Sequence, residues 1–249
     1  MASPDPPSGT LSFVPLEANP PLMTSLLHSL GLSESLQIHD VYSLTDPDLL
    51  AFLPRPALAL LLVFPVSATY ESHRLAEDSL YAPPPPAPAN SDESVLWFPQ
   101  TIRNSCGLMG LLHAALNGPA QDFVEPGSDL HRILEAAKGL DAEGRARLLE
   151  KDEGLREKYG VVAEQGDTAA PGKEEEVDLH YVCFVKGKDG GLWELDGRRK
   201  GPLKRAELGK GEDVDVLNED ALREGVLKFL EREGGDLRFS AVVLAGGLD

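Results

Sequence analysis

The stretch QTIRNSCGLMGLLHAALN, residues 100–117, decides how the rest of the chain is interpreted. The apolar residues after Cys106 leave no polar face, which predicts a helix buried on most sides. A short polar side chain, Asn104 or Ser105, can cap its first turn, and Asn117 followed by glycine and proline ends it. We therefore expect Cys106 at the N-terminus of a buried helix, where free N–H groups and the helix dipole favour a thiolate.

This stretch alone leaves two interpretations of Cys106. Free cysteine is among the most buried residue types, so the side chain could simply fill the core. It could instead be a nucleophile, which requires a general base and a group that orients the base. A partner elsewhere in the chain must decide between the two.

A predicted β-hairpin offers such partners. Residues 177–185 and 192–196 have the composition of two strands joined by the turn KGKDGG. If the turn is centred near Lys188, His180 lies directly opposite Asp196, with Cβ atoms about 4.5–5.5 Å apart on the same face. An imidazole and a carboxylate so placed can hydrogen-bond, which fixes the tautomer and stabilises the imidazolium.

Other residues compete for these roles. Glu194 shares the face parity of His180, and a bulge would shift the register in its favour over Asp196. His113 is on the cysteine helix, but seven residues rise about 10.5 Å, too far for direct proton transfer, so we interpret it as structural. Cys183 has the opposite parity to His180 and is expected in the core.

Gln100 completes the candidate set. Its side-chain amide could donate to an oxyanion together with the backbone N–H of Cys106, which is the usual large contribution in acyl-transfer catalysis. Two cysteines and scattered histidines have no metal-ligand spacing, so we expect neither a metal nor another cofactor. The low cysteine count also predicts a reducing compartment, the cytoplasm or the nucleus.

Composition limits the partners. The chain has 249 residues and a net charge of −18, which disfavours binding to nucleic-acid phosphates and suits a basic partner reached by electrostatic steering. We expect no signal peptide, because residues 1–11 have the composition of a flexible polar tail. The longest apolar run, residues 57–64, is too short to span a bilayer, so no membrane role is expected.

The remaining pattern predicts an α+β fold. The proline-rich residues 82–90 cannot form a helix or a ladder and are expected to be an exposed loop, more often a spacer than an SH3 or WW ligand. The acidic residues 160–178 are expected to be a long functional loop. Helices are predicted at about 20–30, 46–53, 70–80, 106–116, 128–138, 141–159 and 220–233, and strands at 36–42, 57–64, 177–185, 192–196 and 237–245.

At these residues the sequence resembles the ubiquitin C-terminal hydrolase family, short papain-like cysteine peptidases. The resemblance extends over nearly the whole chain from residue 12 to residue 245. It implies that Cys106 is the nucleophile, His180 the general base and acid, Asp196 the orienting group and Gln100 the oxyanion donor. The motifs are PLEANP (15–20), VYSLTDPDLLAFLPRP (41–56), QTIRNSCG (100–107), DLHYV (178–182), ELDGR (194–198) and DLRF (236–239).

The resemblance also implies a fold and a site architecture. It predicts one catalytic domain over residues 12–249, with a central antiparallel sheet between helices and a knotted backbone. Residues 160–178 resemble a loop that crosses over the active site. The positions that resemble ubiquitin contacts are Pro15, Leu16, Asp40 and Phe239.

The implied activity is thiol-dependent cleavage of small adducts or short peptides from the C-terminal glycine of ubiquitin, through an acyl-enzyme thioester. Two alternatives stay open at this point. The chain could act on another ubiquitin-like modifier such as Nedd8, or could bind and stabilise ubiquitin with slow turnover. We expect a monomer.

Overall fold

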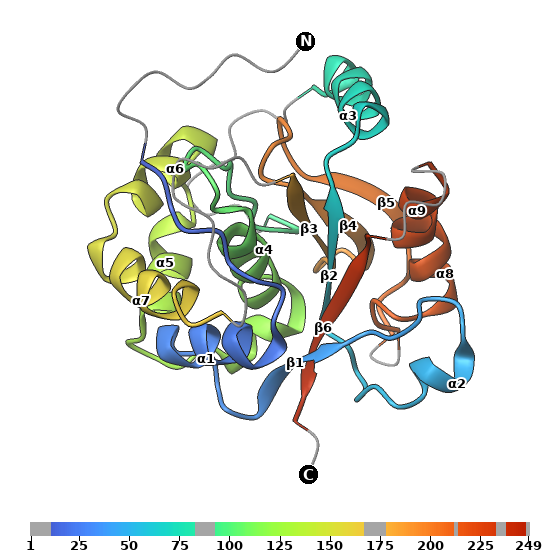
Figure 1. The fold of residues 1–249 in the computed structure, drawn as a ribbon, viewed down its shortest axis with the longest axis horizontal. Coiled ribbons are helices and arrows are strands. Elements are labelled where there is room, and N and C mark those ends of the chain that lie inside the picture. The colour runs from blue at the N-terminus through green and yellow to red at the C-terminus, as the bar shows by residue number, and fades with distance from the viewer. Residues whose placement is uncertain (1–10, 83–92, 167–177, 212–213, 233–237, 248–249) are drawn as a thin grey trace.

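The computed structural model describes residues 11–82, 93–166, 178–211, 214–232 and 238–247. Within these ranges, six strands form one antiparallel sheet in the order β1-β6-β2-β3-β4-β5 (Figure 1). Strand β6, late in the chain, lies between two early strands. The strands are β1 (Leu36–Asp40), β2 (Ala59–Pro65), β3 (Leu179–Lys186), β4 (Gly191–Leu195), β5 (Leu203–Glu207) and β6 (Ser240–Gly246).

Helices cover both faces of this sheet. In Figure 1, α1 and α4 to α7 lie on one side of the strands, and α2, α8 and α9 lie on the other. The predicted α+β class, with an antiparallel sheet between helices, is confirmed. The helices are α1 (Pro20–Leu30), α2 (Pro47–Leu50), α3 (Ala68–Leu80), α4 (Cys106–Ala115), α5 (Asp129–Ala137), α6 (Ala142–Glu150), α7 (Glu153–Ala163), α8 (Glu219–Leu222) and α9 (Lys228–Arg232), with the 3₁₀ helix η1 (Gly118–Phe123) and the π-helical turn η2 (Arg223–Leu227).

Strand β2 is the centre of the core. All seven of its residues are buried. Because successive side chains point to opposite faces, Leu61 and Val63 join the apolar cluster under α1 and α4, whereas Leu62 and Phe64 join the cluster under α8 and α9. The uninterrupted apolar run therefore predicted a strand buried on both faces correctly.

The predicted ends of α1 are also confirmed. Asn19 caps the helix by accepting a hydrogen bond from the N–H of Leu22 at 3.3 Å. Gly31 ends it with φ 99°, a left-handed conformation that favours glycine. A Cβ at Gly31 would also lie 2.0 Å from the Cβ of Ser128, so the position is closed to other side chains.

Three elements differ from the prediction. The helix predicted over 141–159 is two helices, because Asp152 caps α7 through the N–H of Leu155 at 3.0 Å. Since α7 continues to Ala163, the start of the predicted loop 160–178 is helical, and residues 167–177 lie outside the described residues, as does most of the proline-rich loop. The edge strand β5 was not predicted, because the sequence LKRAE has no apolar alternation.

In the described parts of the chain, no helix combines the length and the apolar character that crossing a membrane requires.

Candidate active site

Helix α4 begins at the cysteine, as predicted. Gly107 to Ala115 are buried, and Cys106 alone in this helix keeps partial exposure. Ser105 occupies the N-cap position, but its hydroxyl donates to the carbonyl of Ile102 at 2.8 Å and makes no capping hydrogen bond. The capping bond predicted for Ser105 is therefore absent.

His180 and Asp196 form the predicted hydrogen bond. The Nε2 atom of His180, on β3, lies 2.7 Å from Oδ1 of Asp196, and both side chains are buried. The predicted register is wrong by two residues, because Cys183 pairs with Leu195, so the two residues are not directly opposite. Asp196 lies just beyond the end of β4 on the same face, and its side chain still reaches the imidazole.

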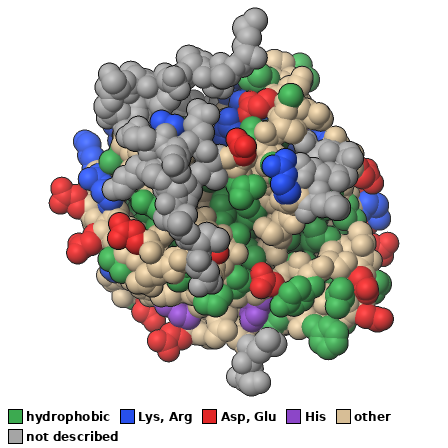
Figure 2. Space-filling view, viewed as in Figure 1, with side chains coloured by type: hydrophobic (Ala, Val, Ile, Leu, Met, Phe, Trp, Pro, Cys, Tyr) green, Lys and Arg blue, Asp and Glu red, His purple; other side chains and the backbone are tan. Residues whose placement is uncertain are grey.

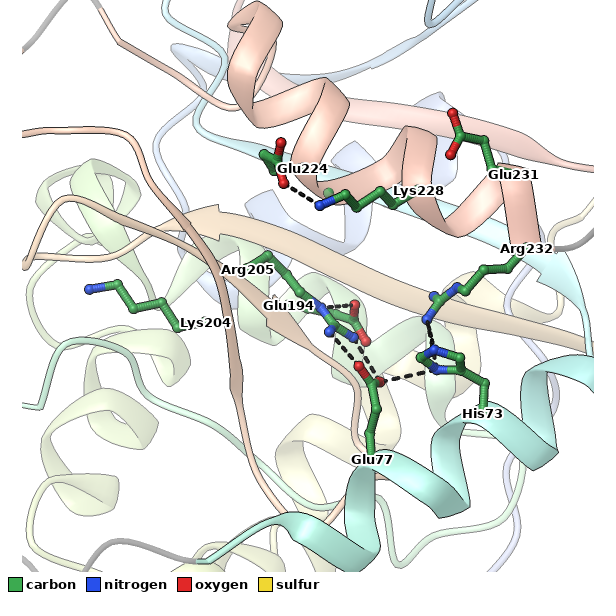
Figure 3. Close-up of a pocket in the computed structure, with 10 residues that line it drawn as sticks. His73, Glu77, Glu194, Lys204, Arg205, Glu224, Lys228, Glu231 and Arg232 are labelled. Atoms are coloured by element: carbon green, nitrogen blue, oxygen red, sulfur yellow. Dashed lines mark hydrogen bonds and ion pairs between the residues drawn. The ribbon is translucent and has the colours of Figure 1, made fainter.

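Glu194 does not compete for the imidazole. It lies opposite Phe184 in the ladder, and its carboxylate binds Nε of Arg199 at 2.9 Å and Nε of Arg205 at 2.8 Å. Figure 3 shows this carboxylate facing Arg205. Both residues line a cavity of about 470 Å³ between α3, β5 and α9. The alternative that Glu194 orients His180 is therefore wrong.

The thiol lies close to the imidazole. Sγ of Cys106 is 4.0 Å from the carbonyl of Leu179, the residue before His180, and the cysteine contributes to the electrostatic environment of the imidazole. Since Nε2 is taken by Asp196, Nδ1 is the nitrogen left for the thiol. Burial opposes a charged imidazole, but Asp196 and Cys106 outweigh it and raise the pKa of His180 to about 9. Burial would likewise raise the pKa of Asp196, but the bonds from His180 and Tyr70 hold it below its usual range.

The backbone of Gln100 is bound to the residue that follows Asp196. Its N–H donates to the carbonyl of Gly197, the residue after Asp196, at 2.8 Å. Its side-chain Nε2 is 3.5 Å from the carbonyl of Ile102, a long contact, and its Oε1 is buried with no hydrogen-bond partner among the described residues. The amide is thus held at the site while its N–H₂ group stays weakly engaged.

His113 is engaged elsewhere. Its Nε2 accepts a hydrogen bond from the N–H of Phe98 at 3.0 Å, and the side chain is fully buried. Burial lowers the pKa of His113 to about 4, so the imidazole is neutral at neutral pH. The structural interpretation of His113 agrees with this geometry. Cys183 is also fully buried, as expected.

The sequence did not predict the other hydrogen-bond partners of Asp196. The hydroxyl of Tyr70 donates to Oδ2 at 2.5 Å, and the N–H of Arg198 donates to Oδ1 at 2.9 Å. The indole N–H of Trp97 donates to the backbone carbonyl of Asp196 at 3.0 Å. Only tertiary structure joins Tyr70 and Trp97 to the aspartate, so no spacing rule could have found them.

The four predicted ubiquitin contacts differ in exposure. Asp40, at the end of β1, is exposed, and Pro15 and Phe239 are half-buried. Leu16 is buried, packs near Gly107 and accepts a hydrogen bond from Tyr181 through its carbonyl, so its side chain does not present a surface to a partner. Around α2, at the lower right of Figure 2, apolar side chains gather on the surface, where Tyr42 and Phe52 are exposed.

The described ranges hold no cluster of three His, Cys, Asp or Glu side chains that could bind a metal ion.

Fold and site together are those of an α+β cysteine peptidase. The family model described as ubiquitin carboxyl-terminal hydrolase, family 1, matches residues 13–231, and this chain belongs to that family. Among curated relatives, ubiquitin carboxyl-terminal hydrolase YUH1 of Saccharomyces cerevisiae is 34% identical over 230 residues, covering 88% of this chain and 89% of the relative. Isozyme L1 of Monodelphis domestica is 35% identical over 234 residues, covering 94% and 98%.

A solved structure has the same fold. The catalytic domain of Trichinella spiralis UCH37, bound to ubiquitin vinyl methyl ester, superposes with a TM-score of 0.69 at 20% identity, covering 97% of both chains.

Proposed function

We propose that this protein is a thiol-dependent deubiquitinating hydrolase that releases small adducts or short peptides from the C-terminal glycine of ubiquitin. The observation that carries the proposal is the thiol at the start of α4, beside an imidazole whose other nitrogen binds a buried carboxylate. Family membership supplies the substrate class.

The proposed mechanism is acyl transfer through a thioester. The Cys106 thiolate attacks the carbonyl carbon of the terminal glycine, and the N–H of Cys106 and the Gln100 amide stabilise the oxyanion. The imidazolium of His180 gives its proton to the leaving amine or thiol as the acyl bond breaks. Neutral His180 then takes a proton from water, the hydroxide attacks the thioester, and the sulfur leaves as the thiolate beside the imidazolium, which restores the starting state. Asp196 holds the imidazole in place throughout.

Several features support ubiquitin as the substrate. The acidic chain suits the arginine-bearing tail of ubiquitin through electrostatic steering. Asp40, Pro15 and Phe239 stay candidates for ubiquitin contacts. The exposed apolar side chains around α2, including Phe52, suit a protein partner.

The remaining expectations belong to this proposal. Ubiquitin is favoured over Nedd8, and side-by-side kcat/KM values for the two substrates decide between them. Hydrolysis is favoured over passive ubiquitin binding, because a binding protein needs no assembled thiol, imidazole and carboxylate. We further propose a monomer located in the cytoplasm with a share in the nucleus, which light scattering and imaging of the tagged protein can test.

Mass spectrometry after mixing with ubiquitin that carries a C-terminal thiol-reactive electrophile tests the proposal. One added ubiquitin is expected, located at Cys106 and absent in Cys106→Ala. Cys183→Ala is the matched control and should react as the parent does. If Cys106 reacts with iodoacetamide but not with the ubiquitin probe, the thiol is reactive toward a different acyl group and the proposed substrate is wrong.

A further inference from the structure

The buried carboxylate of Asp196 has separate partners on its two oxygens. Oδ1 accepts from Nε2 of His180 at 2.7 Å and from the N–H of Arg198 at 2.9 Å. Oδ2 accepts from the hydroxyl of Tyr70 at 2.5 Å, whereas Nε of Arg199 lies 3.9 Å from the same oxygen. Tyr70 therefore holds the oxygen that faces away from the imidazole.

The connection from β2 to α3 positions the Tyr70 hydroxyl next to Asp196. Phe64, near the end of β2, pairs with His180 in the ladder. Ser67 caps α3 by accepting a hydrogen bond from the N–H of Tyr70 at 2.9 Å, which places Tyr70 in the first turn. The rings pack together, with centroids 4.9 Å apart for Phe64 and Tyr70 and 6.0 Å apart for Tyr70 and His180.

Ion pairs fix α3 against the segment that follows β4. Arg74 donates to the carbonyl of Arg198 at 3.0 Å, and Arg198 in turn binds Glu71 at 2.6 Å. Arg199 binds Glu77 at 2.8 Å. These contacts join the helix that carries the Tyr70 hydroxyl to the segment that carries the Asp196 carboxylate. They therefore hold the hydroxyl and the carboxylate in a fixed relative position.

The charge states suit a strong hydrogen bond. Burial and the negative charge of Asp196 raise the pKa of Tyr70, so the hydroxyl keeps its proton at neutral pH. The pKa of Asp196 is lowered, so its acceptor is a carboxylate. An O–H donor on a carboxylate oxygen is among the stronger and shorter hydrogen bonds in proteins.

We infer that Tyr70 is a positioning residue for hydrolysis: it fixes the rotamer of Asp196, so that Oδ1 points at Nε2 of His180 and Nδ1 at Cys106. This inference rests on the proposed function. Tyr70 acts through Asp196 and touches neither the thiol nor the acyl carbon in this mechanism.

The first test is Tyr70→Phe, which keeps the ring and removes the hydroxyl. With a ubiquitin substrate that carries a C-terminal fluorogenic amide, kcat should fall about tenfold, as expected for losing a hydrogen bond to a charged group. KM should stay unchanged. Tyr81→Phe, which removes the same atom at the other end of α3, is the matched control and should keep the parent kcat.

A double-mutant cycle separates positioning from general structural support. In an Asp196→Ala background the hydroxyl of Tyr70 has no carboxylate to hold, so adding Tyr70→Phe should change kcat less than about twofold. A fall of the same factor in both backgrounds would mean that Tyr70 supports the fold and would overturn the inference. Thermal unfolding of all four proteins confirms that each is folded at the assay temperature.

Alkylation of Cys106 by iodoacetamide needs no ubiquitin. It therefore tests the role of Tyr70 separately from the proposed function. The rate of Cys106 modification by iodoacetamide should fall several-fold in Tyr70→Phe, and adding Tyr70→Phe to Asp196→Ala should change it no further. If the parent alkylates but does not hydrolyse the ubiquitin amide, the proposed substrate fails and this rate still decides on Tyr70. If Tyr70→Phe hydrolyses and alkylates as the parent does, the positioning role fails and the proposed function stands.

Discussion

The backbone of Gln100 touches Gly197. The N–H of Gln100 donates to the carbonyl of Gly197 at 2.8 Å, and a Cβ on Gly197 would lie 2.9 Å from Cβ of Gln100 and 3.1 Å from its backbone N. The segment before the nucleophile and the segment after Asp196 thus meet where only glycine fits. A residue that looks like a simple turn glycine sets the position of the proposed oxyanion donor.

Gly197→Ala should therefore displace Gln100. Loss of one oxyanion donor costs about 10²–10³ in kcat, and a partial displacement should cost about tenfold or more. Steady-state kinetics on the fluorogenic ubiquitin amide measures this. Gly160→Ala is the control, because nothing lies within 4 Å of a Cβ at that position in α7. Equal kcat values for the two variants would show that the approach of Gly197 to Gln100 does not matter for turnover.

Two buried carboxylates in neighbouring positions should respond differently to substitution. Glu194→Ala removes the carboxylate that the buried Arg199 binds at 2.9 Å and leaves Glu77 as its remaining close partner. Removing one member of a buried ion pair costs about 3–5 kcal/mol in the free energy of unfolding, which urea denaturation measures. The kcat of the folded fraction should stay near that of the parent. Asp196→Ala should instead lower kcat by orders of magnitude, and a comparable kcat loss in Glu194→Ala would contradict the assignment of roles.

His113→Ala should act mainly on stability. The substitution leaves the N–H of Phe98 without its acceptor and opens a cavity beside α4, which together should lower the free energy of unfolding by about 2–4 kcal/mol. Chemical denaturation measures the loss, and kinetics at a temperature where the variant is folded should show little change in kcat. A loss of kcat as large as that of His180→Ala would assign His113 to the chemistry.

Stability should fall as the pH rises through the alkaline range. The pKa of His180 is raised to about 9 in the folded protein, against about 6.5 unfolded. Between these values the folded state binds more protons than the unfolded state. The contribution of protonated His180 to the free energy of unfolding is therefore complete below pH 6.5 and is lost by about pH 9. Urea unfolding over this range in the parent and in His180→Gln measures it. The groups that raise the pKa of His180 are Asp196 and Cys106, so Cys106→Ala should reduce the pH dependence of stability.

The two cysteines should differ in reactivity. Cys183 is fully buried, and burial raises the pKa of its thiol, whereas Cys106 keeps partial exposure. Iodoacetamide should modify the native protein once, at Cys106, and a second time only after denaturation. Peptide mapping by mass spectrometry locates the label. Modification of native Cys183 at a comparable rate would mean that the sheet opens readily.

Local patterns predicted much of this structure. Asn19 and Gly31 mark the ends of α1 because capping depends on the residues themselves, and the apolar run of β2 requires burial on both faces. The parity of His180 and Asp196 was also correct, since side-chain alternation along strands survives a shift of two residues.

The failures have physical causes too. The glycine-rich turn between β3 and β4 is compatible with several strand registers. The N–H of Gly187 donates to the carbonyl of Gly191, so the turn is centred later in the chain than Lys188, the position that the prediction assumed. Strand β5 lies at the edge of the sheet, where charged residues are tolerated and no apolar pattern is needed. Tyr70 reaches Asp196 only through the packing of α3, which no sequence period records.

The place of β6 in the sheet has a consequence for biosynthesis. Residues 36–40 leave the ribosome early, yet β1 pairs with β6, whose residues 240–246 are made some two hundred positions later. One edge of strand β2 also pairs with β6 and stays unpaired until β6 has been made. Vectorial synthesis therefore leaves β1 and one edge of β2 without their strand partner until translation is nearly done, and unpaired strand edges of this kind promote association between chains.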